Sequence, residues 1–267
     1  MHKSSFIEES DARLEQSGGQ RLSLAIESST RDASLVLADC GEPLQHIPLN
    51  PQFRTAATIS ESIAALLAKA EEIGSPIDYV AVADGPGSFT GLRIGVTSAK
   101  TLAYALGCRL IGVDSLAAIA SGLWEKFPGA QEVIVALNAY RSQVYAARWT
   151  AAQWRDACSS GDFTEQSDVW GAEQWNDELA KTSANTVVGA EAILAKRLTS
   201  LKESSPDDVS SIPDDVSSIP ATVVTVEPSA RQVAKLAHQL ALMGKFTSPM
   251  ELLPRYLRDS AAEEKLG

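Results

Sequence analysis

The sequence predicts an α/β protein with two lobes, each built on a mixed β-sheet. Strand-like segments joined by short turns come first, and strand–helix units follow them, which favours a mixed sheet with helices packed on it. The second half of the chain shows the same order of elements less clearly. The length of 267 residues is sufficient for two hydrophobic cores.

The first lobe is predicted between residues 21 and 128. Polar turns separate three strand patterns, and helices of apolar periodicity then alternate with further strands. In chain order we expect strands at 21–29, 33–40 and 41–49, a helix at 54–73, a strand at 78–85, a helix at 91–106, a strand at 109–115 and a helix from Ser115. The predicted order is therefore βββαβαβα.

The second lobe is predicted between residues 129 and 248. We expect strands at 131–139, 143–149, 185–190 and 221–227, and helices at 191–202 and 229–243, the last of them capped by Ser229. Residues 150–185 have no regular pattern, although they contain Trp154, Trp170 and Trp175. Residues 249–267 are interpreted as a C-terminal tail.

Two segments have no pattern of a packed element. Residues 1–20 are polar and acidic and contain no apolar stretch, so we interpret them as a disordered extension rather than a secretory signal. The heptapeptide PDDVSSI at 206–212 recurs at once at 213–219. Proline within each unit is incompatible with a continuous helix, which favours a tandem duplication in a surface loop.

Composition and charge exclude several classes of protein. No run approaches 18 uninterrupted apolar residues, so no membrane span is expected. The formal net charge is −11 and the basic residues form no cluster, so we expect contact with tRNA only indirectly, through a partner. Three scattered cysteines, Cys40, Cys108 and Cys158, indicate reduced thiols and a cytoplasmic location.

The stretch DGPGSFTG, residues 84–91, lies between a predicted strand and a predicted helix. Backbone N–H groups and the positive end of a helix dipole at such a turn suit an anion. The lysine of a nucleotide P-loop is missing, so a purely structural turn is the alternative. The candidate phosphate- or nucleotide-binding residues are Gly85, Gly87, Ser88 and Thr90 here, with Glu27, Ser28, Ser29 and Thr30 after the first strand.

Small residues recur every four positions along the helix at 91–106. Gly95 costs about 1 kcal/mol of helix propensity relative to alanine, so a close approach should offset it. Either a second polypeptide packs on this ridge, or the ridge lies against its own sheet. The predicted partner interface comprises Ile59, Ile63 and Leu66 on helix 54–73, and Gly91, Leu92, Gly95, Val96, Ala99 and Ala103 on helix 91–106.

Three motifs resemble the TsaB family, the YeaZ-type subunits of the bacterial tRNA N6-threonylcarbamoyladenosine (t6A) system. They are AIESST at 25–30, DGPGSFTGLRIGVTSAKTLAYALG at 84–107 and PRYLR at 254–258. The resemblance covers residues 21–258 and is strongest over 22–116. It implies the fold of actin, sugar kinases and Hsp70 (the ASKHA type), with two RNase-H-like lobes.

The resemblance also implies a scaffold or activator subunit without catalytic residues of its own. Such a subunit binds a TsaD-like protein, which transfers the threonylcarbamoyl group to N6 of adenosine 37 in ANN-decoding tRNAs. A TsaE-like ATPase joins through the complex. Similar proteins form a homodimer through the same first-lobe helices when the TsaD-like protein is absent. The resemblance leaves open whether ATP or ADP binds together with Mg²⁺ at the interface of the assembled complex.

Several positions differ from the residues that are typical of the related proteins. TsaD-like subunits hold a metal through a His-x-x-x-His pair on the helix matching 54–73, and none of His2, His46 and His238 lies there, so no metal site is expected. Glu27 stands where the family usually has Asp. Asn138 and Gln143 replace carboxylates that are common in relatives, and RTAATIS at 54–60 replaces the usual start of the first helix.

Two alternative functions stay open. A small-molecule kinase of the same fold would need a second phosphate-binding turn, for which VVGAEA at 187–192 is the nearest match, and also a Mg²⁺ carboxylate and a base. The other alternative is a subunit that binds nucleotide only at the assembled interface. Arg93 could hold an anion or a neighbouring carboxylate. The C-terminal tail could dock on the first lobe or reach the partner.

Overall fold

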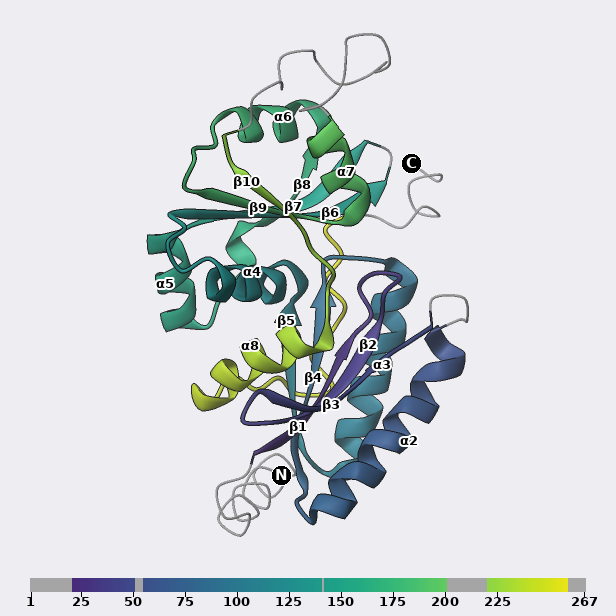
Figure 1. Ribbon diagram of the computed structural model, residues 1–267. Helices are drawn as coiled ribbons and strands as arrows, with labels where there is room; N and C mark the ends of the chain where they lie inside the picture. Colours follow the sequence, from purple (N-terminus) through teal and green to yellow (C-terminus); the bar gives the residue numbers. More distant parts are fainter. Residues whose placement is uncertain (1–20, 51–54, 141, 201–219, 259–267) are drawn as a thin grey trace. The chain divides into compact units, whose positions relative to one another are not determined.

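The computed structural model describes residues 21–50, 55–140, 142–200 and 220–258, and the chain divides into two compact units. Figure 1 shows the elements of both. Among the described residues, unit 1 comprises those from Arg21 to Ala118 together with 228–256, and unit 2 comprises those from Ile119 to Glu227 together with 257–258. The extension predicted at 1–20 and the duplicated loop at 206–219 lie outside the described residues.

Unit 1 is built on a five-stranded mixed sheet in the order β3-β2-β1-β4-β5. The strands are β1 (Leu22–Glu27), β2 (Ser34–Asp39), β3 (Glu42–Pro48), β4 (Ile77–Gly85) and β5 (Arg109–Asp114). β1 and β2 pair antiparallel, as do β2 and β3, whereas β1, β4 and β5 run parallel. The six residues of β1 are all buried, because this strand lies in the middle of the sheet with helices on both faces.

Three helices cover this sheet. α2 (Thr55–Ile73) and α3 (Phe89–Leu106) lie side by side on one face, and α8 (Ala230–Leu242) packs across the strands on the other face (Figure 1). α3 begins at the cap Ser88 and ends at Gly107, whose φ of 63° is a left-handed C-cap. α8 begins with a capping box formed by Ser229 and Gln232, which confirms the predicted cap.

Unit 2 repeats the plan of unit 1 with a second five-stranded sheet, in the order β10-β9-β6-β7-β8. Its strands are β6 (Glu132–Tyr140), β7 (Gln143–Thr150), β8 (Ser167–Gly171), β9 (Thr186–Ala190) and β10 (Thr222–Thr225). The pairs β6–β7 and β7–β8 are antiparallel, and β6, β9 and β10 are parallel. The predicted α/β fold with two mixed sheets is therefore confirmed.

The division of the chain differs from the predicted boundaries at 128/129 and 248/249. The first division falls after Ala118, inside α4 (Ser115–Lys126). Residues 228–248, which we assigned to the second lobe, belong to unit 1 because α8 packs on all five strands of its sheet. The backbone N–H of Ala230, for example, donates to Ser34 Oγ of β2 at 3.0 Å. The order of elements along the sequence cannot show that α8, which follows the strands of unit 2, packs on the sheet of unit 1.

Residues 150–185 are more regular than the sequence indicated. They form α5 (Ala151–Ser160), a short 3₁₀ turn (Thr164–Gln166), β8 and α6 (Ala172–Ala180). A capping-box pattern, Thr150 with Gln153, begins α5 and was the signal that could have predicted this helix. α7 (Ala192–Ser200) follows β9. Across the described ranges, no helix has the length and apolar character needed to cross a membrane.

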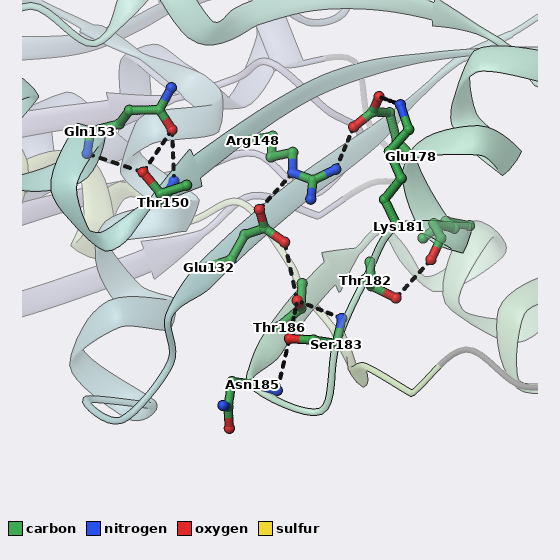
Figure 2. Close-up of polar contacts among 11 residues, drawn as sticks. Glu132, Arg148, Thr150, Gln153, Glu178, Lys181, Thr182, Ser183, Asn185 and Thr186 are labelled. Atoms are coloured by element: carbon green, nitrogen blue, oxygen red, sulfur yellow. Dashed lines mark hydrogen bonds and ion pairs between the residues drawn. The ribbon is translucent and has the colours of Figure 1, made fainter.

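Arg148 joins four elements of unit 2 through carboxylates (Figure 2). Its Nε donates to Glu132 Oε1 at 2.6 Å, so β7 is tied to β6, and its Nη1 forms an ion pair with Glu178 of α6. Thr186 Oγ1 of β9 donates to the other oxygen of Glu132 at 3.1 Å, and Lys181 pairs with Glu178 at 2.7 Å. Arg148 is only 24% exposed, so this network is better shielded from water than an ordinary surface ion pair.

Replacing Arg148 with Met is expected to destabilise unit 2 by about 2 kcal/mol, because Glu132 loses this charged donor and Glu178 keeps only the exposed Lys181. Lys181→Met is the matched control, since Lys181 is 61% exposed and pairs with the same Glu178. We expect that control to cost less than about 1 kcal/mol. Urea unfolding followed by tryptophan fluorescence measures both, and equal losses would contradict this interpretation.

Candidate functional site at the carboxyl edge of the first sheet

The parallel strands β1, β4 and β5 end at the same edge of the unit 1 sheet. A carboxylic acid lies at or next to each of these strand ends: Glu27 ends β1, Asp84 precedes the last residue of β4, and Asp114 ends β5. In open α/β sheets this edge is where ligands usually bind. The edge is therefore the candidate functional site of unit 1.

Glu27 is buried at 1% exposure, and its own turn supplies its hydrogen bond. The backbone N–H of Ser29 donates to Glu27 Oε1 at 2.5 Å. Burial raises the pKa of Glu27 to about 7, although the hydrogen bonds from Ser29 oppose that shift. Burial thus favours the neutral form of Glu27 over its carboxylate.

The two turns predicted to bind phosphate lie directly against each other. The N–H of Ser88 donates to the carbonyl oxygen of Ser29 at 2.6 Å, and Ser28 Oγ donates to the carbonyl oxygen of Gly91 at 2.9 Å. A Cβ built on Gly87 would lie 2.5 Å from that same Ser29 oxygen, so glycine is needed for the close approach. The structure thus brings Ser28 and Ser29 together with the start of α3.

The remaining predicted phosphate residues lie around this contact. Gly85, with φ of 134°, ends β4, and its missing side chain leaves room for the backbone of Arg255. Thr30 is half-buried, and Ser88 and Thr90 are exposed. Because the Ser88 amide is already bonded within the protein, phosphate contact at this turn stays a prediction.

Asp84, Asp114 and Arg255 are the residues of this edge that we did not single out as a site. The Arg255 side chain forms an ion pair with Asp114 and donates from Nη2 to the Gly85 carbonyl oxygen at 2.9 Å. Burial and the neighbouring Asp114 raise the pKa of Asp84 to about 7, against the opposing charge of Arg255. Acidic residues at the ends of two parallel strands, in VADG and GVDS, were the signal for Asp84 and Asp114.

Two sequence-level questions are answered at this edge. The C-terminal residues through Tyr256 dock on unit 1, as the bond from the Arg255 N–H to the Asp84 carbonyl oxygen shows. Arg93 stacks on Phe89 and donates to Tyr256 Oη at 3.1 Å, so its partners among the described residues are aromatic. Within the described ranges, no group of three or more His, Cys, Asp or Glu residues is placed to hold a metal ion.

The small residues of α3 have an explanation within unit 1. Cβ atoms on Gly91 and Gly95 would collide with the carbonyl oxygen and with Oγ of Ser28, respectively. Ala99 and Ala103 are fully buried. Among the nine predicted interface residues, Ile63 alone is half-buried; the other eight, Ile59, Leu66, Gly91, Leu92, Gly95, Val96, Ala99 and Ala103, are buried in unit 1. Whether these helices also contact a second polypeptide stays a prediction.

Replacing Glu27 with Gln is expected to stabilise the protein at pH 8 and to have little effect near pH 4. A raised carboxyl pKa in the folded state contributes stability that is present below the unfolded pKa and lost as pH rises through about 7. Gln keeps the acceptor for Ser29 without the charge, so the gain at pH 8 should reach about 3 kcal/mol. Thermal unfolding at several pH values measures it, with the exposed Glu61→Gln as control.

Replacing Gly95 with Ala is expected to destabilise unit 1 by about 1–3 kcal/mol, because the new Cβ collides with Ser28 Oγ. In a Ser28→Ala background the same change should be neutral or stabilising, since Ala favours the helix by about 1 kcal/mol. Gly91→Ala is the control, because it collides with backbone and should stay destabilising in that background. Urea unfolding of the double-mutant cycle tests this, and additive effects at Gly95 would contradict it.

Comparison with known proteins places the chain in a family. The family model described as TsaD, tRNA N6-adenosine threonylcarbamoyltransferase, matches residues 52–266. The tRNA threonylcarbamoyladenosine biosynthesis protein TsaB of Escherichia coli K12 is 35% identical over 126 residues, which are 47% of this chain and 54% of that protein. TsaB of Haemophilus influenzae is 33% identical over 46% of this chain and 51% of its own length. The matches thus span about half the length of these relatives.

A solved structure agrees with the fold. YeaZ from Pseudomonas aeruginosa superposes with a TM-score of 0.63 and 21% sequence identity, covering 89% of this chain and all of that chain. The α/β fold with two mixed sheets is thus also the fold of YeaZ. From the family model, the curated relatives and this fold together, the chain belongs to the TsaB/YeaZ family and carries a domain of the tRNA N6-adenosine threonylcarbamoyltransferase (TsaD) family.

Proposed function

We propose that this chain is a non-catalytic subunit of the t6A-forming machinery and binds a TsaD-like catalytic subunit through α2 and α3. The TsaD-like subunit would transfer the threonylcarbamoyl group to N6 of adenosine 37 in ANN-decoding tRNAs. A TsaE-like ATPase would join through the complex. The observation that carries the proposal is the outer surface of these two helices, in a chain that belongs to the TsaB/YeaZ family.

The outer surface of α2 and α3 is poor in large and charged side chains at its centre. Its exposed residues between the helix ends are Ala64, Ala65 and Ala68 on α2 and Thr97, Thr101, Tyr104 and Ala105 on α3; the other exposed residues, Ser60, Glu61, Glu71 and Glu72 of α2 and Thr90 and Arg93 of α3, lie toward the helix ends. Tyr104 is 78% exposed and offers a large side chain that an interface can bury. Alanine and threonine cost little side-chain entropy when a partner helix packs on them. This surface suits helix-to-helix contact with another chain.

The buried ridge of α3 supports this surface indirectly. Gly91 and Gly95 let α3 approach the Ser28 turn closely, and Ile59 and Leu66 anchor α2 in the same core. The predicted interface residues would thus fix the position of both helices, while their exposed neighbours make the contact. The same surface would form the homodimer when the TsaD-like subunit is missing.

The charges at the carboxyl edge support a non-catalytic role for unit 1. Arg255 of the chain itself pairs with Asp114, and burial favours the neutral forms of Glu27 and Asp84. A kinase acting here would need carboxylates free to bind Mg²⁺ and to accept a proton. The net charge of −11 likewise favours a partner that supplies the basic surface for tRNA.

Mixing the full chain with its TsaD-like partner should give a complex whose mass is the sum of the subunits, measured by size exclusion with light scattering. Ala68→Arg is expected to weaken this complex at least tenfold, because a large charge enters the centre of the surface. Ala152→Arg is the matched control, as Ala152 is an exposed helical alanine of unit 2. Reconstituted t6A formation should fall with Ala68→Arg only.

Two results would overturn the proposal. One is the absence of any complex when both proteins are folded. The other is a complex that Ala68→Arg and Ala152→Arg weaken equally, because the contact would then not depend on α2 and α3. A threonylcarbamoyl transfer activity of this chain alone would contradict the non-catalytic assignment.

A further inference from the structure

Residues 247–256 follow the outer strand β5 to the carboxyl edge of the unit 1 sheet. The N–H of Thr247 donates to the Leu110 carbonyl oxygen at 2.8 Å, and the N–H of Arg255 donates to the Asp84 carbonyl oxygen at 2.7 Å. The segment therefore begins beside the start of β5 and reaches the strand ends at Arg255. We call residues 252–256 the C-terminal strap.

The first attachment of the C-terminal strap is apolar. Leu252 is 5% exposed and belongs to the core cluster of unit 1. It fits above Gly112 of β5, where a Cβ would lie only 2.7 Å from Leu252 Cδ1. Lys100 of α3 donates from Nζ to the Leu252 carbonyl oxygen at 2.9 Å. The missing side chain of Gly112 thus leaves room for Leu252 and for the Asp84 carboxylate, and the backbone of Leu252 is also held.

The second attachment is ionic. The Arg255 side chain is 23% exposed; it pairs with Asp114, which is 2% exposed, and donates to the Gly85 carbonyl oxygen. Asp114 Oδ1 accepts the N–H of Ala117 at 2.7 Å, so the carboxylate is held in place by α4 independently of the strap. The site is thus an acidic socket, built by the folded unit and complementary to a guanidinium.

The third attachment is aromatic. The ring of Tyr256 stacks on Phe89 at a centroid distance of 4.5 Å, and its hydroxyl accepts a hydrogen bond from Arg93 Nε at 3.1 Å. Between the attached residues the strap faces solvent, since Leu253 is 69% exposed. Three side chains, spaced as Leu-x-x-Arg-Tyr, and two backbone hydrogen bonds therefore hold the segment. Short peptide ligands are bound by other proteins in this way.

We propose that the carboxyl edge of the unit 1 sheet is a binding site for peptides of the pattern Leu-x-x-Arg-Tyr, and that the C-terminal strap fills this site in cis. The apolar socket at Gly112, the acidic socket at Asp114 and the aromatic socket at Phe89 and Arg93 are its three subsites. Weakening the guanidinium contact should release the strap and leave the site free to take the same peptide in trans.

Hydrogen exchange of the full chain tests cis binding, because the Arg255 amide is itself bonded to Asp84. Asp114→Asn removes the charge and keeps an oxygen for Ala117, as Asn is also a good helix cap. In this variant and in Arg255→Met, the backbone amide of residue 255 should exchange its hydrogen at least tenfold faster than in the unsubstituted chain. The exchange rate of the Thr247 amide should change less than twofold. Arg231→Met, an exposed arginine of α8, is the matched control. Unchanged exchange in both variants overturns the proposal.

Binding of a fluorescein-labelled peptide, MELLPRYLR (residues 250–258), tests the site itself by anisotropy. The peptide should bind Arg255→Met, and should bind at least tenfold more weakly to the unsubstituted chain and to Arg255→Met/Asp114→Asn. A peptide with Met at the arginine should not bind. If circular dichroism shows that Arg255→Met is unfolded, Arg255→Lys takes its place, because it keeps the charge but loses the planar geometry. Any of three results overturns the proposal: the peptide does not bind the folded variant, it binds the unsubstituted chain equally well, or it binds the Arg255→Met/Asp114→Asn variant as tightly as Arg255→Met.

Discussion

The contact between the turn after β1 and the start of α3 is the constraint on which unit 1 depends. Ser28 and Ser29 pack against the backbone of α3 so closely that Gly87, Gly91 and Gly95 have no room for a Cβ. The Ser29 carbonyl accepts the N–H of Ser88, and Ser88 in turn caps the helix. The close approach thus sets where α3 begins and how near it lies to the central strand β1. The position of α3 in turn sets the position of its outer surface beside α2 and of its N-terminus at the carboxyl edge of the sheet.

The carboxyl edge of the unit 1 sheet keeps the position of a ligand site but balances its charges internally. Burial raises the pKa of Glu27 to about 7, desolvation and the neighbouring Asp114 raise the pKa of the half-buried Asp84 to about 7, and Asp114 is paired with Arg255. The Arg255 guanidinium pairs with Asp114, and burial favours the neutral forms of the other two carboxyls, which reduces the net charge at this edge. That balance fits a subunit whose contribution is a docking surface on α2 and α3, and it explains why the C-terminal strap binds where it does.

The two units have the same sheet order but are stabilised by different interactions. Unit 1 relies on close backbone packing at glycine, whereas unit 2 ties β6, β7, β9 and α6 together with the carboxylates around Arg148. Four tryptophan and phenylalanine rings, those of Trp124, Trp149, Trp154 and Phe163, pack together in the same unit. A shared topology therefore does not require a shared core chemistry.

The sequence by itself determined the element order outside residues 150–185, the two mixed sheets, the start of α8 at Ser229 and the motifs of the TsaB/YeaZ family, because these depend on periodicity, capping residues and local composition. It also indicated that Gly91 and Gly95 meet a close neighbour. Only the tertiary structure decided that this neighbour is Ser28, that α8 returns to the first sheet and that Arg255 pairs with Asp114. Those contacts join residues 63 to 196 positions apart, and no local pattern encodes which distant segment a buried surface will meet.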